Sequence, residues 1–185
     1  MDRRIKYTKK VIKEAFLKLL EEKELKRVTV SELCKIADIN RATFYRYYLD
    51  VYDLFDKIQE EFAAELKNTI VKNENYTIES FSRGFLEVLV KEKELAKVIF
   101  DERNNLLFLN DILELTYDYC YESWKNEALD ISPLEVEYAT IFIFNGALGI
   151  INYWIKNDFS ESVEEIANLI AKLSYKGIKS YIYKK

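Results

Sequence analysis

The scarcity of helix-breaking residues is the feature that most constrains the fold of this chain. Its 185 residues include only four Gly and one Pro, and its apolar residues recur mostly three or four positions apart, the spacing of one helix face. Long helices joined by short connections account for both observations. We therefore expect an all-α fold, and the chain is long enough to bury a substantial hydrophobic core.

Charge is distributed unevenly along the chain. Residues 1–50 hold 13 Lys and Arg against 8 Asp and Glu, a net charge of +5, whereas residues 51–185 hold 15 against 24, a net charge of −9. A basic segment joined to an acidic remainder favours contact with a polyanion such as nucleic acid. The alternative is an ordinary Lys-rich surface near the N-terminus.

The residue types present argue against an enzyme. The chain has no His, which excludes His-based catalysis and His-ligated metal sites. Cys34 and Cys120 lack metal or redox spacing, and no motif indicates a cofactor. The most apolar run, residues 139–155, is too short and too interrupted for a membrane span. We expect a cytoplasmic protein with no metal, no cofactor and no membrane partner.

Capping signals predict a compact set of helices at the N-terminus. An apolar stripe predicts a first helix over residues 8–23. Thr29 with Glu32 three residues later forms a capping box for a second, short helix. After a tight turn Asn40 can cap a third helix, and a long helix follows over residues 50–70. Two helices separated by a tight turn are typical of a helix-turn-helix.

Further helices are expected in the rest of the chain. The clearest start is Ser132, with Pro133 at the first helical position and Glu135 at the third. The predicted ranges are 77–91, 94–103, 105–127, 133–157 and 162–183. The sequence contains no internal repeat.

The segment NRATFYRYY, residues 40–48, combines aromatic residues with two arginines. Its helical phase directs Phe44 and Tyr48 toward the core. The residues left largely outward are Arg41, Ala42, Thr43, Tyr45, Arg46 and Tyr47. Such a face suits a DNA major groove, because Arg pairs with guanine, methyl groups meet thymine and Tyr hydroxyls reach phosphates. The alternative is that these tyrosines pack between helices.

The run TVSELCKIADINRATFYRYYLDVYDLF resembles the DNA-binding head of TetR/AcrR-type transcriptional regulators. The resemblance covers residues 8–56, and the later run NGALGIINYWIKNDFSESVEEIANLI is similar to the last two helices of some members. The matching head positions are Thr29, Ala37, Ile39, Thr43, Tyr45, Tyr48, Leu54 and Phe55. Two positions depart from the pattern: Asp38 stands at the usual turn Gly, and Val51 stands at a Lys that usually contacts the DNA backbone.

The resemblance implies a set of DNA contacts. Those expected nearest the bases are Asn40, Arg41, Ala42, Thr43 and Arg46. Those expected at phosphates are Thr29, Ser31, Tyr45 and Tyr47. Three lysines of the first helix would partly replace the Lys that is missing at position 51, namely Lys6, Lys9 and Lys10.

The resemblance also implies a division into a helix-turn-helix DNA-binding domain, residues 1–48, and a helical ligand-binding and dimerisation domain, residues 49–185. The last two helices are expected to pair with those of a second copy in a four-helix bundle. The predicted interface residues are Gly146, Ile150, Val163, Ile166, Ile170, Leu173 and Gly177. The alternative is that both helices are buried within one subunit.

Aromatic residues in the middle of the chain fit either an effector pocket or an ordinary core. The resemblance implies a pocket for a small apolar or aromatic effector, with candidate lining residues Phe85, Phe108, Tyr117, Tyr121, Trp124 and Phe142. It further implies a sequence-specific regulator, most often a repressor, that an effector releases from a near-palindromic operator. The alternative function is a co-regulator of the same fold that acts through a protein partner.

Overall fold

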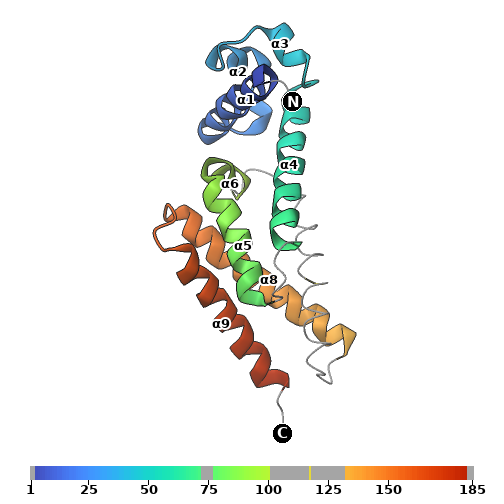
Figure 1. Cartoon of the computed structure of the whole chain (residues 1–185), viewed down its shortest axis with the longest axis vertical. Helices are drawn as coiled ribbons and strands as arrows, with labels where there is room; N and C mark the ends of the chain where they lie inside the picture. The colour runs from blue at the N-terminus through green and yellow to red at the C-terminus, as the bar shows by residue number, and fades with distance from the viewer. Residues whose placement is uncertain (1–2, 72–76, 101–116, 118–131, 183–185) are drawn as a thin grey trace. The chain divides into compact units, whose positions relative to one another are not determined.

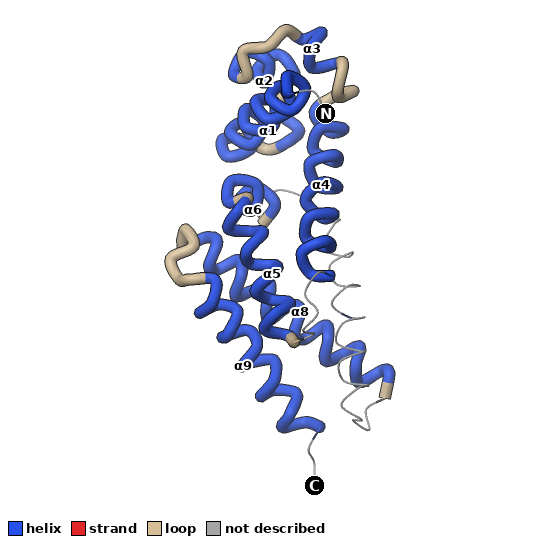
Figure 2. The backbone as a smooth tube through the Cα atoms, in the orientation of Figure 1, coloured by secondary structure: helices blue, strands red, loops and turns tan. Residues whose placement is uncertain are grey.

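The computed structural model describes residues 3–71, 77–100, 117 and 132–182 (Figure 1). Throughout these ranges the regular structure is helical, which confirms the all-α prediction (Figure 2). The helices are α1 (Arg3–Glu22), the 3-10 turn η1 (Leu25–Arg27), α2 (Val30–Ile36), α3 (Arg41–Tyr45), α4 (Val51–Val71), α5 (Ile78–Lys91), α6 (Lys93–Ile99), α8 (Pro133–Lys156) and α9 (Val163–Ile182). The helix predicted over 105–127 lies outside the described residues.

The chain divides into two compact units. The first, here called the head, contains the chain up to Phe62 and a short segment from Lys97. The second, here called the body, contains Ala63–Ala96 and the described residues from Ser132 onward. The head therefore extends beyond residue 48, and α4 contributes residues to both units.

The caps predicted in the head are present. Thr29 Oγ1 accepts a hydrogen bond from Glu32 N, and the Glu32 carboxylate accepts one from Thr29 N, which completes the capping box of α2. Asn40 Oδ1 accepts from Ala42 N at 2.9 Å and caps α3. Between the two helices Asp38 has φ 51°, a left-handed conformation that Asp tolerates better than most residues. The helix-turn-helix is thus built from local signals.

The first helix begins five residues earlier than predicted. It starts at Arg3 rather than Thr8, so Thr8 lies inside the helix. Thr8 Oγ1 donates to the carbonyl of Arg4 at 2.9 Å, a bond one helical turn back. Arg3 and Arg4 therefore join the basic side chains of α1.

The core of the head joins α1, α2, α3 and the start of α4. The Phe16 and Phe55 rings lie 5.8 Å apart, centroid to centroid. The most completely buried side chains are Ile12, Phe16, Leu20, Leu33, Phe44 and Leu54. Each such side chain contributes about 1.5–3 kcal/mol relative to exposure, so this cluster holds the short helices α2 and α3 in place.

In the body, α5 packs along α9, and α9 also contacts α8. The turn between α8 and α9 is closed by Trp154, whose indole N–H donates to the Glu161 carbonyl at 2.9 Å. The Trp154 ring meets the edge of Phe159 at 4.9 Å between centroids. Both helices begin at the predicted serine caps, Ser132 and Ser162.

Candidate DNA-binding site

The helix α3 is anchored by two aromatic side chains. Phe44 is completely buried and Tyr48 is 6% exposed, which confirms their predicted inward direction. Their rings lie 5.5 Å apart between centroids. Burial raises the pKa of Tyr48 to about 12, so its phenol is neutral at physiological pH. These two contacts determine which face of α3 turns outward.

The outward face of α3 carries the predicted base-contacting residues. Arg41, Ala42, Tyr45 and Arg46 are exposed, as is the cap Asn40, whereas Thr43 and Tyr47 are half-buried. In the part of the chain that the structure describes, Arg46 forms no ion pair. An exposed guanidinium without a carboxylate partner retains its full charge for an anionic ligand.

Arg41 and Ser31 meet across the turn of the helix-turn-helix. The Arg41 Nη2 group donates a hydrogen bond to Ser31 Oγ at 2.6 Å. The predicted base contact and one predicted phosphate contact are therefore bonded to each other. The Arg41 charge also acts on Cys34, where it opposes the larger effect of burial, which raises the pKa of that thiol. Sequence reasoning named both residues but did not pair them.

A polar network joins the end of α3 to α4. Lys57 Nζ donates to the Tyr47 carbonyl at 3.2 Å and to Asp53 Oδ2 at 2.9 Å. The same ammonium lies 5.4 Å from the centre of the Tyr48 ring. Asp53 Oδ2 also accepts from Leu49 N at 2.8 Å; this bond and the one from Lys57 lower the pKa of Asp53. Sequence reasoning missed Lys57. Its position four residues after Asp53 indicated only an ion pair on the helix surface, which is a weak signal.

The departure at position 51 has a structural explanation. Val51 is 6% exposed, so its side chain belongs to the head core and offers nothing to a phosphate. Two neighbouring apolar side chains are exposed instead: Leu49 at 80% and Tyr52 at 50%. The Tyr52 hydroxyl is a hydrogen-bond donor next to the position where the Lys was expected.

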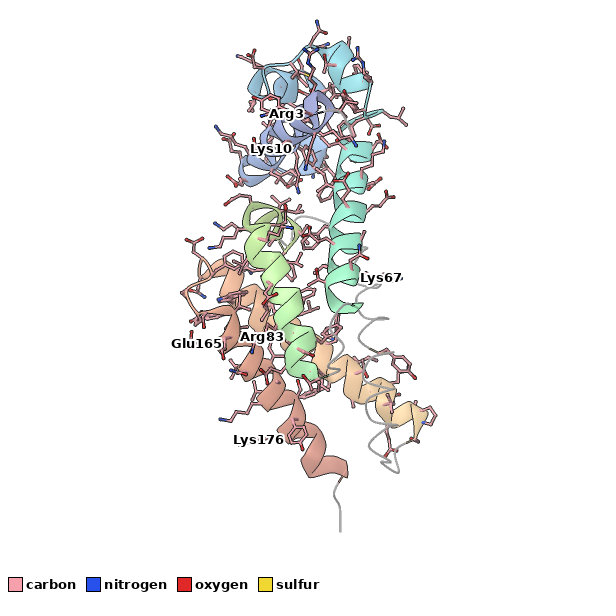
Figure 3. The ribbon with its side chains drawn as sticks, in the orientation of Figure 1. Arg3, Lys10, Lys67, Arg83, Glu165 and Lys176 are labelled. Carbon is pink, nitrogen blue, oxygen red and sulfur yellow. The ribbon has the colours of Figure 1, made fainter. Side chains whose placement is uncertain are left out.

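The start of α1 adds positive charge. Lys6 and Lys10 are exposed and Lys9 is half-buried, and the first turn of the helix has no acidic residue. Arg3 and Lys10 both project from α1 in Figure 3, and Lys10 lies 3.6 Å from the Glu14 carboxylate. Cations at a helix N-terminus oppose the helix dipole, so an anion bound there would relieve an unfavourable arrangement.

The candidate effector residues differ in exposure in the described structure. Phe85 is buried, Tyr117 is half-buried and Phe142 is 75% exposed. Phe85 and Phe142 therefore do not share one interior site. Phe108, Tyr121 and Trp124 lie outside the described residues.

The candidate dimer residues fall into two groups. Ile166 and Ile170 are buried inside the subunit, because α9 packs along α5. Gly146 and Leu173 are exposed, and Ile150 and Val163 are half-buried. Gly177 belongs to the end of α9, whose side chains are not described.

An exposed apolar stripe follows one face of α8. It consists of Leu134, Tyr138, Ile141, Phe142 and Tyr153, with Gly146 and Gly149 between them, where an added Cβ would meet nothing within 4 Å. By length and composition α8 could also cross a membrane, and 28% of its most apolar window is buried. Intervals of mostly three or four residues already indicated this stripe in the sequence, but the sequence analysis placed Phe142 in the candidate pocket and Gly146 at the dimer interface.

Comparison with known proteins identifies a family and relatives of this chain. Residues 76–176 match the TetR family model described as "Transcriptional regulator C-terminal region". Over 67 residues the chain is 33% identical to the HTH-type transcriptional regulator YxbF of Bacillus subtilis (strain 168), a match that covers 36% of this chain and 18% of that relative. The chain thus matches less than a fifth of that relative's length.

Solved structures share the fold along nearly the whole chain. The dihydroxyacetone kinase operon activator DhaS has a TM-score of 0.64 at 24% identity and covers 94% of this chain and 97% of its own. FadR from Bacillus subtilis, in complex with stearoyl-CoA, has a TM-score of 0.67 at 18% identity, and the match covers 90% of this chain and 97% of the FadR chain. A TetR-like regulator from Rhodococcus sp. RHA1 has a TM-score of 0.71 at 15% identity, and the match covers 96% of this chain and 98% of that regulator.

These relatives are transcriptional regulators rather than enzymes. The family model alone covers more than half of the chain, and the solved relatives share its helix-turn-helix head and helical body. The chain is therefore a member of the TetR/AcrR family of transcriptional regulators.

Proposed function

We propose that this regulator is a cytoplasmic homodimer that binds a near-palindromic operator through α3 and represses transcription there. The observation that supports this most directly is the division of α3. Phe44 and Tyr48 anchor one face, while Arg41, Tyr45 and Arg46 are exposed on the other. Such a face fits the major groove, where Arg reads guanine and Tyr reaches phosphate.

Contacts on either side of α3 would complete the interface. We assign the base edges to Asn40, Arg41, Ala42, Thr43 and Arg46, and the phosphates to Thr29, Tyr45, Tyr47, Lys6, Lys9 and Lys10. Tyr52 would take the place of the Lys that is missing at position 51. The half-buried positions of Thr43 and Tyr47 restrict them to contacts through their hydroxyl or methyl ends.

The test is duplex binding by the full chain at several salt concentrations. A duplex selected from a random pool by the wild-type protein should bind more tightly than an unselected duplex of equal length. The logarithm of the binding constant should fall by about 0.9 per contacted phosphate for each tenfold rise in salt. Arg46→Ala should reduce binding to the selected duplex roughly 5- to 150-fold, whereas Lys176→Ala, at an exposed position of α9, should not. Absence of any duplex binding at low salt would refute the proposal.

Dimerisation would proceed through α8 and α9. The exposed stripe on α8 includes Tyr138, Phe142 and Tyr153, each 66–75% exposed, and the open surface at Gly146 and Gly149 allows a second helix to approach closely. Association of two copies would cover this apolar surface and present two recognition helices to half-sites about 34–36 Å apart. Phe142→Glu should yield a monomer in sedimentation analysis. A wild-type monomer, or a protein recovered only with membranes, would contradict this assignment.

Effector control is the second part of the proposal. The body buries Phe85, and among the described residues the Thr140 hydroxyl and the Asn152 Oδ1 atom are buried without a hydrogen-bond partner, so its interior combines an apolar surface with two unused polar atoms. FadR, which shares the fold, was solved with stearoyl-CoA, and a long-chain acyl-CoA is therefore the first probe. Its addition should release the selected duplex. Unchanged duplex binding at saturating acyl-CoA would exclude this class of effector.

An alternative function follows from position 51. Because Val51 is buried, the head lacks one basic contact to the DNA backbone, and the fold could instead serve a co-regulator that binds a protein partner. An intact dimer without duplex binding at low salt would favour this alternative.

A further inference from the structure

The bond between Arg41 and Ser31 lies on the surface that α3 presents outward. Ser31 is the second residue of α2 and Arg41 is the first residue of α3, so the bond spans the turn of the helix-turn-helix. The distance from Arg41 Nη2 to Ser31 Oγ is 2.6 Å, and both side chains are exposed. The bond therefore contributes little to the core and acts mainly on the direction of the guanidinium.

We propose that Ser31 is a specificity-determining residue that positions the Arg41 guanidinium for base recognition; this role rests on the proposed DNA-binding function. It replaces the direct phosphate contact that the resemblance implies for Ser31. A positioning residue acts through Arg41, whereas a phosphate contact acts alone.

The chemistry of the two groups suits this role. A guanidinium has five N–H donors, and one bond from Nη2 leaves a complete two-donor edge for the O6 and N7 acceptors of guanine. Serine is a neutral acceptor, so it directs the guanidinium without neutralising it as a carboxylate would. No carboxylate pairs with Arg41 in the described part of the chain. The positive charge remains available to the DNA.

Prior ordering of Arg41 would favour specific binding. A long Arg side chain loses rotamer freedom when it is fixed against a base. Because Ser31 already restricts the guanidinium in the free protein, less of that freedom is lost on binding. The gain applies only where a guanine edge receives the guanidinium, so it increases the preference for the operator rather than the affinity for every duplex.

The test is a double-mutant cycle with the full chain. Wild type, Ser31→Ala, Arg41→Ala and the double variant are compared on the duplex selected by the wild type and on an unselected duplex, at one salt concentration. Ser31→Ala should reduce the preference for the selected duplex roughly 3- to 10-fold and leave unselected binding unchanged. In the Arg41→Ala background it should have no further effect. Ser31→Thr, which keeps the hydroxyl, should restore the preference.

The outcomes separate the two roles of Ser31. An equal loss on both duplexes would overturn the inference in favour of a phosphate contact, because phosphates carry no sequence information. The inference would also be overturned if Ser31→Ala reduced the preference for the selected duplex equally in the wild-type and Arg41→Ala backgrounds. Either result leaves the proposed function intact, whereas a wild type that binds no duplex refutes both. Ala is a good helix former at an exposed position, and an unchanged circular dichroism spectrum confirms that the variant is folded.

Discussion

Phe44 and Tyr45 are neighbours in α3, and their replacement by Ala should have opposite consequences. Phe44 is completely buried and Tyr45 is 56% exposed. The Phe44 ring meets Tyr45 edge-on and Tyr48 at a tilt, with 5.5 Å between centroids in both cases. Phe44→Ala thus removes the side chain that attaches α3 to the rest of the head.

The expected cost of Phe44→Ala is about 3–5 kcal/mol, the usual range for a fully buried Phe. Each aromatic contact accounts for about 0.5–1.5 kcal/mol of it. Total stabilities of domains are about 5–15 kcal/mol, so the variant head should be largely or partly unfolded. Tyr45→Ala loses only one edge contact, about 1 kcal/mol, but it removes a hydroxyl that is proposed to contact phosphate.

Urea titration followed by circular dichroism measures the first effect, and duplex binding measures the second. Phe44→Ala should lower the urea midpoint strongly, while Tyr45→Ala should lower it only slightly and weaken duplex binding. Phe44→Leu is the matched control, since it retains an apolar side chain and should recover much of the lost stability. A Phe44→Ala protein as stable as wild type would refute the division of α3 into a buried and an outward face.

Three further predictions concern single side chains. Thr140→Val should leave stability unchanged or raise it by up to about 1 kcal/mol, because the Thr140 hydroxyl is buried without a partner among the residues that the structure describes; a clear loss in urea titration would show that the hydroxyl is bonded. Ser162 N and Oγ donate to Glu165 and lower its pKa. This carboxylate therefore stabilises α9 above its ordinary pKa and loses its effect as the pH falls through the lowered pKa; Glu165→Gln should flatten the acid side of the stability profile, and an unchanged profile would contradict this. Lys57→Met should weaken duplex binding without changing its salt dependence, because Lys57 acts through Tyr47; a salt slope reduced by about 0.9 would instead indicate a direct phosphate contact.

Local signals in the sequence were sufficient for the helices and their starts. The capping boxes at Thr29, Ser132 and Ser162 need only residues three positions apart, and all are present. The inward direction of Phe44 follows from helical phase alone. The start of α1 shows where local signals fail: the apolar stripe predicted a helix from residue 8, but the helix begins at Arg3, and Thr8 bonds to the preceding turn inside it.

The candidate site was predicted residue by residue but not as an arrangement. The bond between Ser31 and Arg41 joins two helices across a turn, and its length depends on the angle between them. The Lys57 network likewise needs the Tyr47 carbonyl, which has no sequence signature. Ile166 and Phe142 show the same difficulty in the body: both are apolar residues at helical spacing, yet one is buried and the other is 75% exposed.

By itself the sequence determined the all-α fold, the capped helix-turn-helix and the residues of the outward face of α3, because spacing and caps act over three or four residues. Only the tertiary structure decided that Val51 belongs to the head core, that Arg41 bonds to Ser31 and that one face of α8 is left uncovered by its own subunit. Those outcomes depend on how helices distant in sequence pack together. An apolar residue is equally apolar in a core and at an interface, so the sequence pattern is the same for both.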